Sequence, residues 1–304
     1  MPNKEIKMDI NKKINRTILA IAVAEMFSGA AMADFNIDNI GALVTDPAQV
    51  AEVRAQTDHN AFGFIYDGSA NNGASNAVDY LGEAYGFSAA VVVVSPAEFA
   101  EFDPVDFAQD INLANSHGLQ IIVLYDEIIS SGQGQSNEWH INRIEAADAV
   151  VKANIGGSLS WHNEAYTVVP DWSNEFDMAR TVNYLSVDNY FCLSDCVQQG
   201  KPDAMAEHST IFNTVTRYNT LHGAPINGAA RKIALIPPAM SSPNLCGMWD
   251  CAKIMTEYKL GIDALGLDVG AVAFFTWGSI DLELVSGARE FPQLVNLTNG
   301  WRVK

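Results

Sequence analysis

Basic side chains are scarce in this chain of 304 residues. Its 18 Lys and Arg stand against 36 Asp and Glu, which gives a formal net charge of −18 at pH 7. Nucleic-acid binders need clustered cations against phosphates, so this balance predicts no nucleic-acid partner. Collagen-like and disordered chains are excluded too, because only 22 residues are glycine and 48% of the chain is hydrophobic.

Long apolar runs are lacking as well. No stretch approaches the ~18–20 apolar residues of a membrane-spanning helix, so the sequence predicts no membrane span. The apolar segment 17–27 is shorter, follows three basic residues and precedes Ala31-Met32-Ala33, a pattern typical of a secretory signal peptide. An N-terminal amphipathic helix is the alternative. We expect residues 1–33 to be a signal peptide, residues 34–304 to be one catalytic domain, and the protein to be secreted or periplasmic.

Cysteine is limited to four residues, Cys192, Cys196, Cys246 and Cys251. An even number in an exported chain favours disulfides, and the three ways of pairing them stay open. A zinc site of four thiolates is the alternative, although the spacings C-x3-C and C-x4-C are loose for it.

Sequence signatures of several enzyme classes are absent. The chain has no G-x-S-x-G elbow, no H-E-x-x-H zinc pair and no G-x-x-x-x-G-K-[ST] phosphate loop. We therefore predict no cofactor and no bound metal. A metal site that joins His162 to Asp67, Asp126 or Glu164 is the alternative.

What the chain does contain is one unit that repeats. Apolar runs predict strands at 40–45, 62–66, 89–94, 119–125, 157–162, 184–190, 232–237 and 270–277. Runs such as Val91–Val94 are apolar without alternation, as in parallel strands that are buried on both faces. Polar stretches with helical periodicity predict helices at 47–56, 76–85, 105–117, 138–153, 174–182, 203–221, 249–265 and 287–295.

Eight strand–helix units in about 270 residues match a (β/α)8 TIM barrel, which belongs to the α/β class. No break in composition divides residues 34–304, so a single domain is expected. A doubly wound open sheet is the alternative, but no G-x-G-x-x-G follows the first predicted strand.

The C-terminal ends of the strands carry the chemistry in such a barrel. Five of the eight predicted ends have an acid, an aromatic residue or both: Tyr66 and Asp67; Tyr125, Asp126 and Glu127; Trp161, His162, Asn163 and Glu164; Asp188 and Tyr190; and Trp277. Paired carboxylates serve glycoside hydrolysis, and aromatic rings stack on sugars. The sequence therefore predicts a carbohydrate substrate.

Glu164 is the expected general acid/base, because the bulk of Trp161 beside it would raise its pKa by desolvation. Asp188 is the expected second carboxylate, and Asp126 and Glu127 are further candidates. We expect the substrate to contact Trp161, His162, Asn163, Tyr190, Trp277, Tyr125, Tyr66 and Asp67. The alternatives are a solvated Glu164, a structural Asp188, an Asp67 that braces its own loop, and aromatic residues that only pack the barrel rim.

The run Trp161-His162-Asn163-Glu164 resembles the Asn-Glu strand end of the (β/α)8 glycoside hydrolases, in which that Glu is the acid/base. Val187–Tyr190 and Phe275-Thr276-Trp277 are similar to late strands of such barrels, where a Tyr and a Trp line the sugar site. The resemblance implies a secreted glycosidase that acts on an oligo- or polysaccharide. In the large clan with Asn-Glu on the fourth strand a second Glu ends the seventh, whereas here the pair is on the fifth and the seventh ends without an acid. A non-catalytic carbohydrate-binding barrel and a metal-dependent barrel hydrolase are the alternatives.

Overall fold

The computed structural model describes residues 37–67, 73–129, 135–165, 178–188, 231–242, 248–265, 268–280 and 285–301. The chain divides into two compact units, Met1–Asp34 and Phe35–Lys304. The predicted signal peptide falls in the first unit, which lies outside the described residues. The fold below is therefore that of the second unit.

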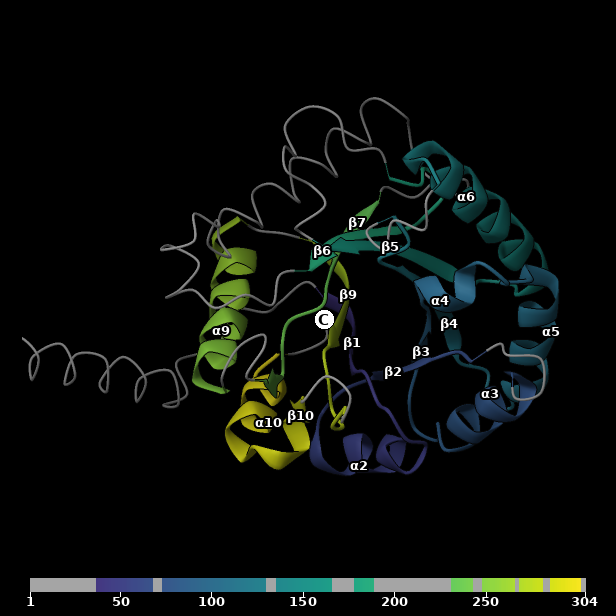
Figure 1. Ribbon diagram of the computed structural model, residues 1–304. Coiled ribbons are helices and arrows are strands. Elements are labelled where there is room, and N and C mark those ends of the chain that lie inside the picture. Colours follow the sequence, from purple (N-terminus) through teal and green to yellow (C-terminus); the bar gives the residue numbers. More distant parts are fainter. Residues whose placement is uncertain are drawn as a thin grey trace, which may run out of the picture. The chain divides into compact units, whose positions relative to one another are not determined.

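Eight parallel strands form the main sheet, which curves into a nearly closed ring (Figure 1). They are β1 (Ile37–Ala42), β2 (Ala61–Ile65), β3 (Ala89–Val94), β4 (Gln120–Asp126), β5 (Leu159–Ala165), β6 (Tyr184–Asp188), β7 (Lys232–Leu235) and β9 (Val269–Phe274). Their order is β1-β9-β7-β6-β5-β4-β3-β2. All eight strands predicted from the apolar runs are present, and the predicted TIM barrel is confirmed.

The seam between β1 and β2 closes the ring. A parallel bridge joins Leu43 to Gly63 just beyond β1, and the backbone N–H of Val44 donates to the carbonyl of Gly63 at 2.8 Å. At the other end of the seam the side chain of Asn60 takes the place of a ladder bond. Its Oδ1 accepts from the N–H of Ile40 at 2.8 Å, and its Nδ2 donates to β1 as well. An open doubly wound sheet is thereby excluded.

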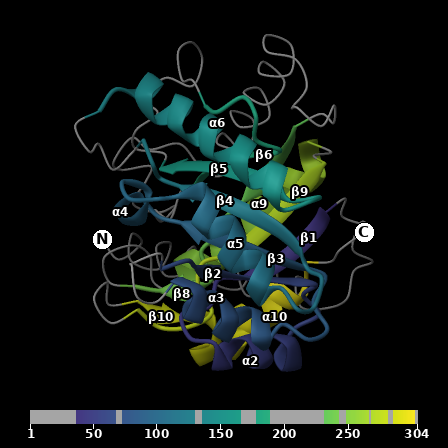
Figure 2. The same cartoon turned by 90° about the vertical axis from the view of Figure 1, so that its right-hand side faces the viewer.

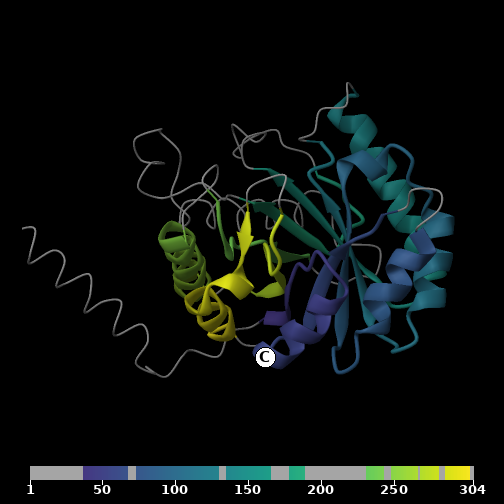
Figure 3. The ribbon, with the colours of Figure 1, turned by 60° about the horizontal axis from the view of Figure 1, so that its bottom comes forward.

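Helices cover the outside of the ring. They are α2 (Ala48–Gln56), α3 (Gly73–Gly82), α4 (Pro96–Phe99), α5 (Pro104–Ala114), α6 (Asn137–Asn154), α9 (Met248–Leu265) and α10 (Pro292–Asn299). Helices α3, α5 and α6 follow the order of the strands beneath them (Figure 2). Helices α9 and α10 contact each other on the side of the barrel away from α5 and α6 (Figure 3). No described helix is long and apolar enough to cross a membrane.

Local sequence explains where α5 begins and which face it buries. Asp103 accepts hydrogen bonds from the N–H groups of Val105 and Asp106, and Pro104 occupies the first helical turn, where its missing N–H costs nothing. Phe107 and Ile111 fall one helical turn apart and are buried against the strands.

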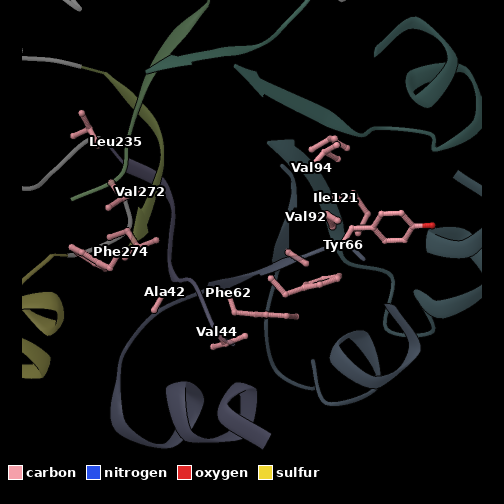
Figure 4. Close-up of a cluster of buried hydrophobic side chains, with 14 of the residues drawn as sticks. Ala42, Val44, Phe62, Tyr66, Val92, Val94, Ile121, Leu235, Val272 and Phe274 are labelled. Carbon is pink, nitrogen blue, oxygen red and sulfur yellow. The ribbon is translucent and has the colours of Figure 1, made fainter. Parts of the chain in front are cut away.

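Two layers of apolar side chains line the two faces of the strands. The inner layer fills the barrel and consists of Ala61, Ala89, Val91, Val93, Ile122, Leu124, Trp161, Tyr184, Ala234, Ile236, Ala271 and Ala273. The outer layer lies between strands and helices and includes Phe62, Val92, Val94 and Phe274 (Figure 4). Because successive side chains of a strand point to opposite faces, these two layers fix the direction of the side chains in between.

Some predicted helices differ from the structure. Of the helix expected at 174–182, residues 178–182 are described and are not helical, and the helix expected at 203–221 lies outside the described residues. The last helix, expected at 287–295, is a 3-10 turn η3 (Ala288–Glu290) followed by α10. Pro292 starts α10 because a proline is favoured in the first turn of a helix. The short α4 and the two-residue strands β8 (Met240–Ser241) and β10 (Ser286–Gly287) were not predicted.

Candidate active site

Three polar side chains form a row across neighbouring strands at the C-terminal end of the barrel. Asp126 of β4 pairs in register with Asn163 of β5, which in turn pairs with Ser186 of β6. Trp161, two residues before Asn163, belongs to the inner layer. Since side chains alternate along a strand, the row faces the inside of the barrel, one step above that layer.

Hydrogen bonds connect this row. The indole N–H of Trp161 donates to Oγ of Ser186 at 2.6 Å, and the Ser186 hydroxyl donates to Oδ1 of Asn163. Nδ2 of Asn163 then donates to Oδ1 of Asp126 at 2.8 Å. Trp161, Asn163 and Ser186 are buried, whereas Asp126 is partly exposed. A chain of donors therefore runs from the filled barrel to one carboxylate at its end.

The surroundings of Asp126 favour its protonated form. Desolvation by burial raises the pKa of Asp126 to about 7, and the negative charges of Glu127 and Glu164 add to the rise. The hydrogen bond from Asn163 acts in the opposite direction, because it stabilises the carboxylate. A carboxyl group that still carries its proton near neutral pH has the property required of a general acid.

Glu127 lies where the chain leaves β4. Its φ of 50° is in the left-handed region, which is uncommon for a residue other than glycine. Its N–H donates to the carbonyl of Asn163 at 2.9 Å, so the turn stays attached to β5. The side chain is partly exposed beside Asp126. Asp126 and Glu127 therefore both lie at this end of β4.

Glu164 does not join this row. Strand β5 stays regular as far as Ala165, so Glu164 points to the face opposite Asn163. The side chain is 0% exposed, and its Oε1 lies 2.9 Å from the backbone N of Ile129 and 2.8 Å from Nε2 of His162. The structure therefore places His162 and Glu164 on the outer face of β5, whereas Asp126 lies in the row that faces the inside of the barrel. The roles predicted for His162 and Glu164 stay predictions.

Three aromatic residues expected to line a sugar site lie in the outer layer instead. Tyr66 donates its hydroxyl to Asp110 of α5 at 2.7 Å, and Trp277 donates its indole N–H to Glu52 of α2 at 3.2 Å. Tyr125 is fully buried among the aromatic side chains that follow β3. Trp161 does face the barrel, but it is buried beneath the polar row. These four rings are buried and pack against the fold, and their predicted role at a sugar site stays a prediction.

Several predicted residues lie wholly or partly outside the described part of the structure. Asp188 ends β6, where its backbone pairs with Ala165, but its side chain is outside the described part of the structure. Tyr190, Cys192, Cys196 and Cys246 also lie outside it, while Cys251 is buried in α9. Asp67 follows β2 and is partly exposed. The roles of these residues and the disulfides stay predictions.

Ser186 is the member of the row that sequence analysis missed. Its signal was present, because it stands two residues before Asp188 on a predicted strand and so shares a face with that position. Within the described ranges no three His, Cys, Asp or Glu side chains are grouped so that they could hold a metal ion.

Known proteins match this chain only in fold. No family model matches it, and no curated protein does so either. A GH5_18 structure from Streptomyces cattleya in complex with Manb1-4GlcNAc has a TM-score of 0.55 at 12% identity and covers 86% of this chain and 80% of that one. A glucosidase from Croceicoccus marinus has a TM-score of 0.51 at 10% identity. The match covers 81% of this chain and 61% of the glucosidase.

A beta-D-glucuronidase from Dictyoglomus thermophilum has a TM-score of 0.49 at 9% identity. The match covers 80% of this chain and 44% of the glucuronidase. The chain thus spans less than two thirds of the length of two of these three proteins. Structures of glycoside hydrolases are among its neighbours, and at such identities the likeness establishes the TIM-barrel fold.

Proposed function

We propose that this protein is a glycoside hydrolase in which Asp126 is the general acid. The observation that carries the proposal is the partly exposed Asp126 carboxyl at the C-terminal end of the barrel, with its pKa raised to about 7. Active sites of TIM barrels lie at that end of the strands. A neighbour in the same fold that is named a glucosidase, and a GH5_18 structure in complex with Manb1-4GlcNAc, support this class of reaction.

The protonated carboxyl of Asp126 gives its proton to the glycosidic oxygen as the bond from that oxygen to the anomeric carbon breaks. A second carboxylate attacks the anomeric carbon or takes a proton from the attacking water. Glu127 and Asp188 are the candidates for this role. A separation of ~5–5.5 Å between the two acting carboxyls implies retention of configuration, and one of ~6.5–9.5 Å implies inversion.

The substrate follows from charge. With 36 acids and 18 basic residues, the protein repels polyanions at distances up to about 8–10 Å. We infer that the substrate is an uncharged oligo- or polysaccharide. We also propose that the protein is secreted after removal of residues 1–33, in a compartment where disulfides form.

The test is digestion of a panel of neutral glycans by the chain from residue 34 onward, with release of reducing ends as the measurement. Asp126→Asn should lower turnover by about 10²–10⁴-fold, the usual contribution of a positioned acid. The melting temperature should not fall, because a neutral amide replaces a carboxyl that burial already disfavours as an anion. Asp58→Asn is the control, since Asp58 is exposed before β2 at the opposite end of the barrel. Full activity of Asp126→Asn would contradict the proposal.

A second candidate is a carbohydrate-binding barrel without catalysis. The position of Glu164 on the outer face favours it, because it takes away one acid of the expected pair. In that case calorimetry on the same glycans would detect binding, while no reducing ends would appear.

A further inference from the structure

Glu164 and His162 form a buried pair on the outer face of β5 that the proposed mechanism does not use. Both side chains are 0% exposed. Nδ1 of His162 accepts from the N–H of Ala179 at 3.1 Å, so in the neutral ring Nε2 carries the proton. That proton is donated to Oε1 of Glu164 at 2.8 Å.

The same oxygen holds the chain that leaves β4. Oε1 of Glu164 also accepts from the backbone N–H of Ile129 at 2.9 Å. Ile129 is three residues beyond Asp126, and Glu127 between them is bonded through its N–H to the carbonyl of Asn163. The four-residue segment Asp126–Ile129, called the β4 exit here, is therefore attached to β5 at both of its ends.

Charge and burial make this attachment strong. A carboxylate that accepts from N–H groups forms shorter and stronger hydrogen bonds than a neutral acceptor does. A side chain that is 0% exposed has no water to replace a lost partner, so a broken bond would leave a buried polar group unsatisfied. The charge of Glu164 also acts on two titratable groups of the described residues, His140 of α6 and Asp126.

We propose that Glu164 is a positioning residue, whose Oε1 fixes the β4 exit and thereby the carboxyls of Asp126 and Glu127. His162 orients Glu164 through Nε2 and is itself held by Ala179. This inference rests on the proposed function, since it assigns Asp126 and Glu127 to the reaction. It gives the Asn-Glu pair of β5 two separate tasks, because Asn163 contacts the acid directly and Glu164 acts through the backbone.

Two substitutions of Glu164 separate the effect of its side-chain length from the effect of its charge. Glu164→Gln keeps the length of the side chain, and its carbonyl oxygen can accept from both Ile129 and His162. Glu164→Asp keeps the charge but is one methylene shorter, so the carboxylate no longer reaches Ile129. A positioning role predicts that the Gln variant stays within about tenfold of the parent in kcat, whereas the Asp variant loses on the order of 10²-fold in kcat with little change in KM.

The pH profile adds a readout that a purely structural role would not change. The charge of Glu164 raises the pKa of Asp126, so Glu164→Gln should move the basic limb of kcat/KM to lower pH. Glu164→Asp keeps this charge and should shift that limb less. Glu127 also raises the pKa of Asp126 and is the same in both variants.

Amide hydrogen exchange tests the contact without any activity. The N–H of Ile129 should exchange slowly in the parent and in Glu164→Gln, and faster in Glu164→Asp. If Glu164→Gln is as inactive as Asp126→Asn, Glu164 is catalytic and the inference is overturned. Unchanged exchange and unchanged kcat in Glu164→Asp would overturn it as well. A parent that hydrolyses no glycan would refute the proposed function, and the exchange of Ile129 would still decide whether Glu164 holds the β4 exit.

Discussion

The amide of Asn163 donates to the carboxylate of Asp126 at 2.8 Å, across the register pair that joins β5 to β4. This bond stabilises the anion and lowers the pKa of Asp126, whereas burial and two neighbouring negative charges raise it. The resulting pKa of about 7 is a balance of opposing effects. Each of them can be changed by a single substitution.

Asn163→Ala should raise the pKa of Asp126 further, because it removes the hydrogen bond that favours the charged form of Asp126. The basic limb of the pH–rate profile should move to higher pH, opposite to the shift expected for Glu164→Gln. The free energy of unfolding should fall by about 1–3 kcal/mol, since Ser186 loses its acceptor inside the barrel.

Measurement of kcat/KM against pH, together with thermal unfolding, checks this prediction. Asn112→Ala is the matched control, because Asn112 is exposed on α5 and bonds only the carbonyl of Asn154 among the contacts described. A basic limb that stays in place in Asn163→Ala would show that this bond does not tune Asp126.

The sequence was sufficient for the fold because apolar runs report burial. Val91–Val94 is buried on both faces, as its lack of alternation indicated, and each predicted strand lies in the ring. The same lack of alternation left the face on which Tyr125 lies undetermined. A strand that is apolar throughout does not indicate which of its residues face inward, so the sequence does not show in which layer the Tyr125 side chain lies.

The sequence places the candidate site residues at the strand ends, and the structure divides them between the inner and outer faces of the strands. Which face a residue takes depends on how far the strand stays regular, and a shift of one residue reverses every side chain. Strand β5 continues to Ala165, which turns Asn163 inward and Glu164 outward. That extension comes from pairing with β6, a contact between distant segments that the residues of β5 alone do not encode.

His59 should make the protein sensitive to acid. It is 7% exposed and stacked on Phe274, with ring centroids 5.5 Å apart, and burial lowers its pKa from 6.5 to about 4. The unfolded chain therefore binds a proton between these two values that the folded chain does not bind. Stability is complete above pH 6.5 and is lost as the pH falls toward 4, by on the order of 2 kcal/mol at pH 5.

Urea unfolding at pH 7.5 and pH 5 measures this effect. His59→Phe keeps a ring against Phe274 and does not titrate, so its midpoint should change less between the two pH values than that of the parent. His117→Phe, at an exposed position, should keep the acid sensitivity of the parent. Equal changes in the parent and in His59→Phe would assign the acid sensitivity to other groups.

Gly41 should be essential for closing the barrel between β1 and β2. A Cβ at this position would lie 2.8 Å from the carbonyl carbon and oxygen of Ala61 and 3.0 Å from the N of Phe62. These are backbone atoms of β2, which cannot move away without disturbing the seam. Gly41→Ala should therefore lower the free energy of unfolding by about 1–3 kcal/mol, the usual cost of overpacking.

Gly82→Ala is the matched control, because Gly82 ends α3 with no atom within 4 Å of an added Cβ. This substitution should be neutral or should stabilise the fold by up to about 1 kcal/mol. Thermal unfolding of both variants decides the point: if Gly41→Ala melts at or above the temperature of Gly82→Ala, the two strands have room that a closed ring does not allow.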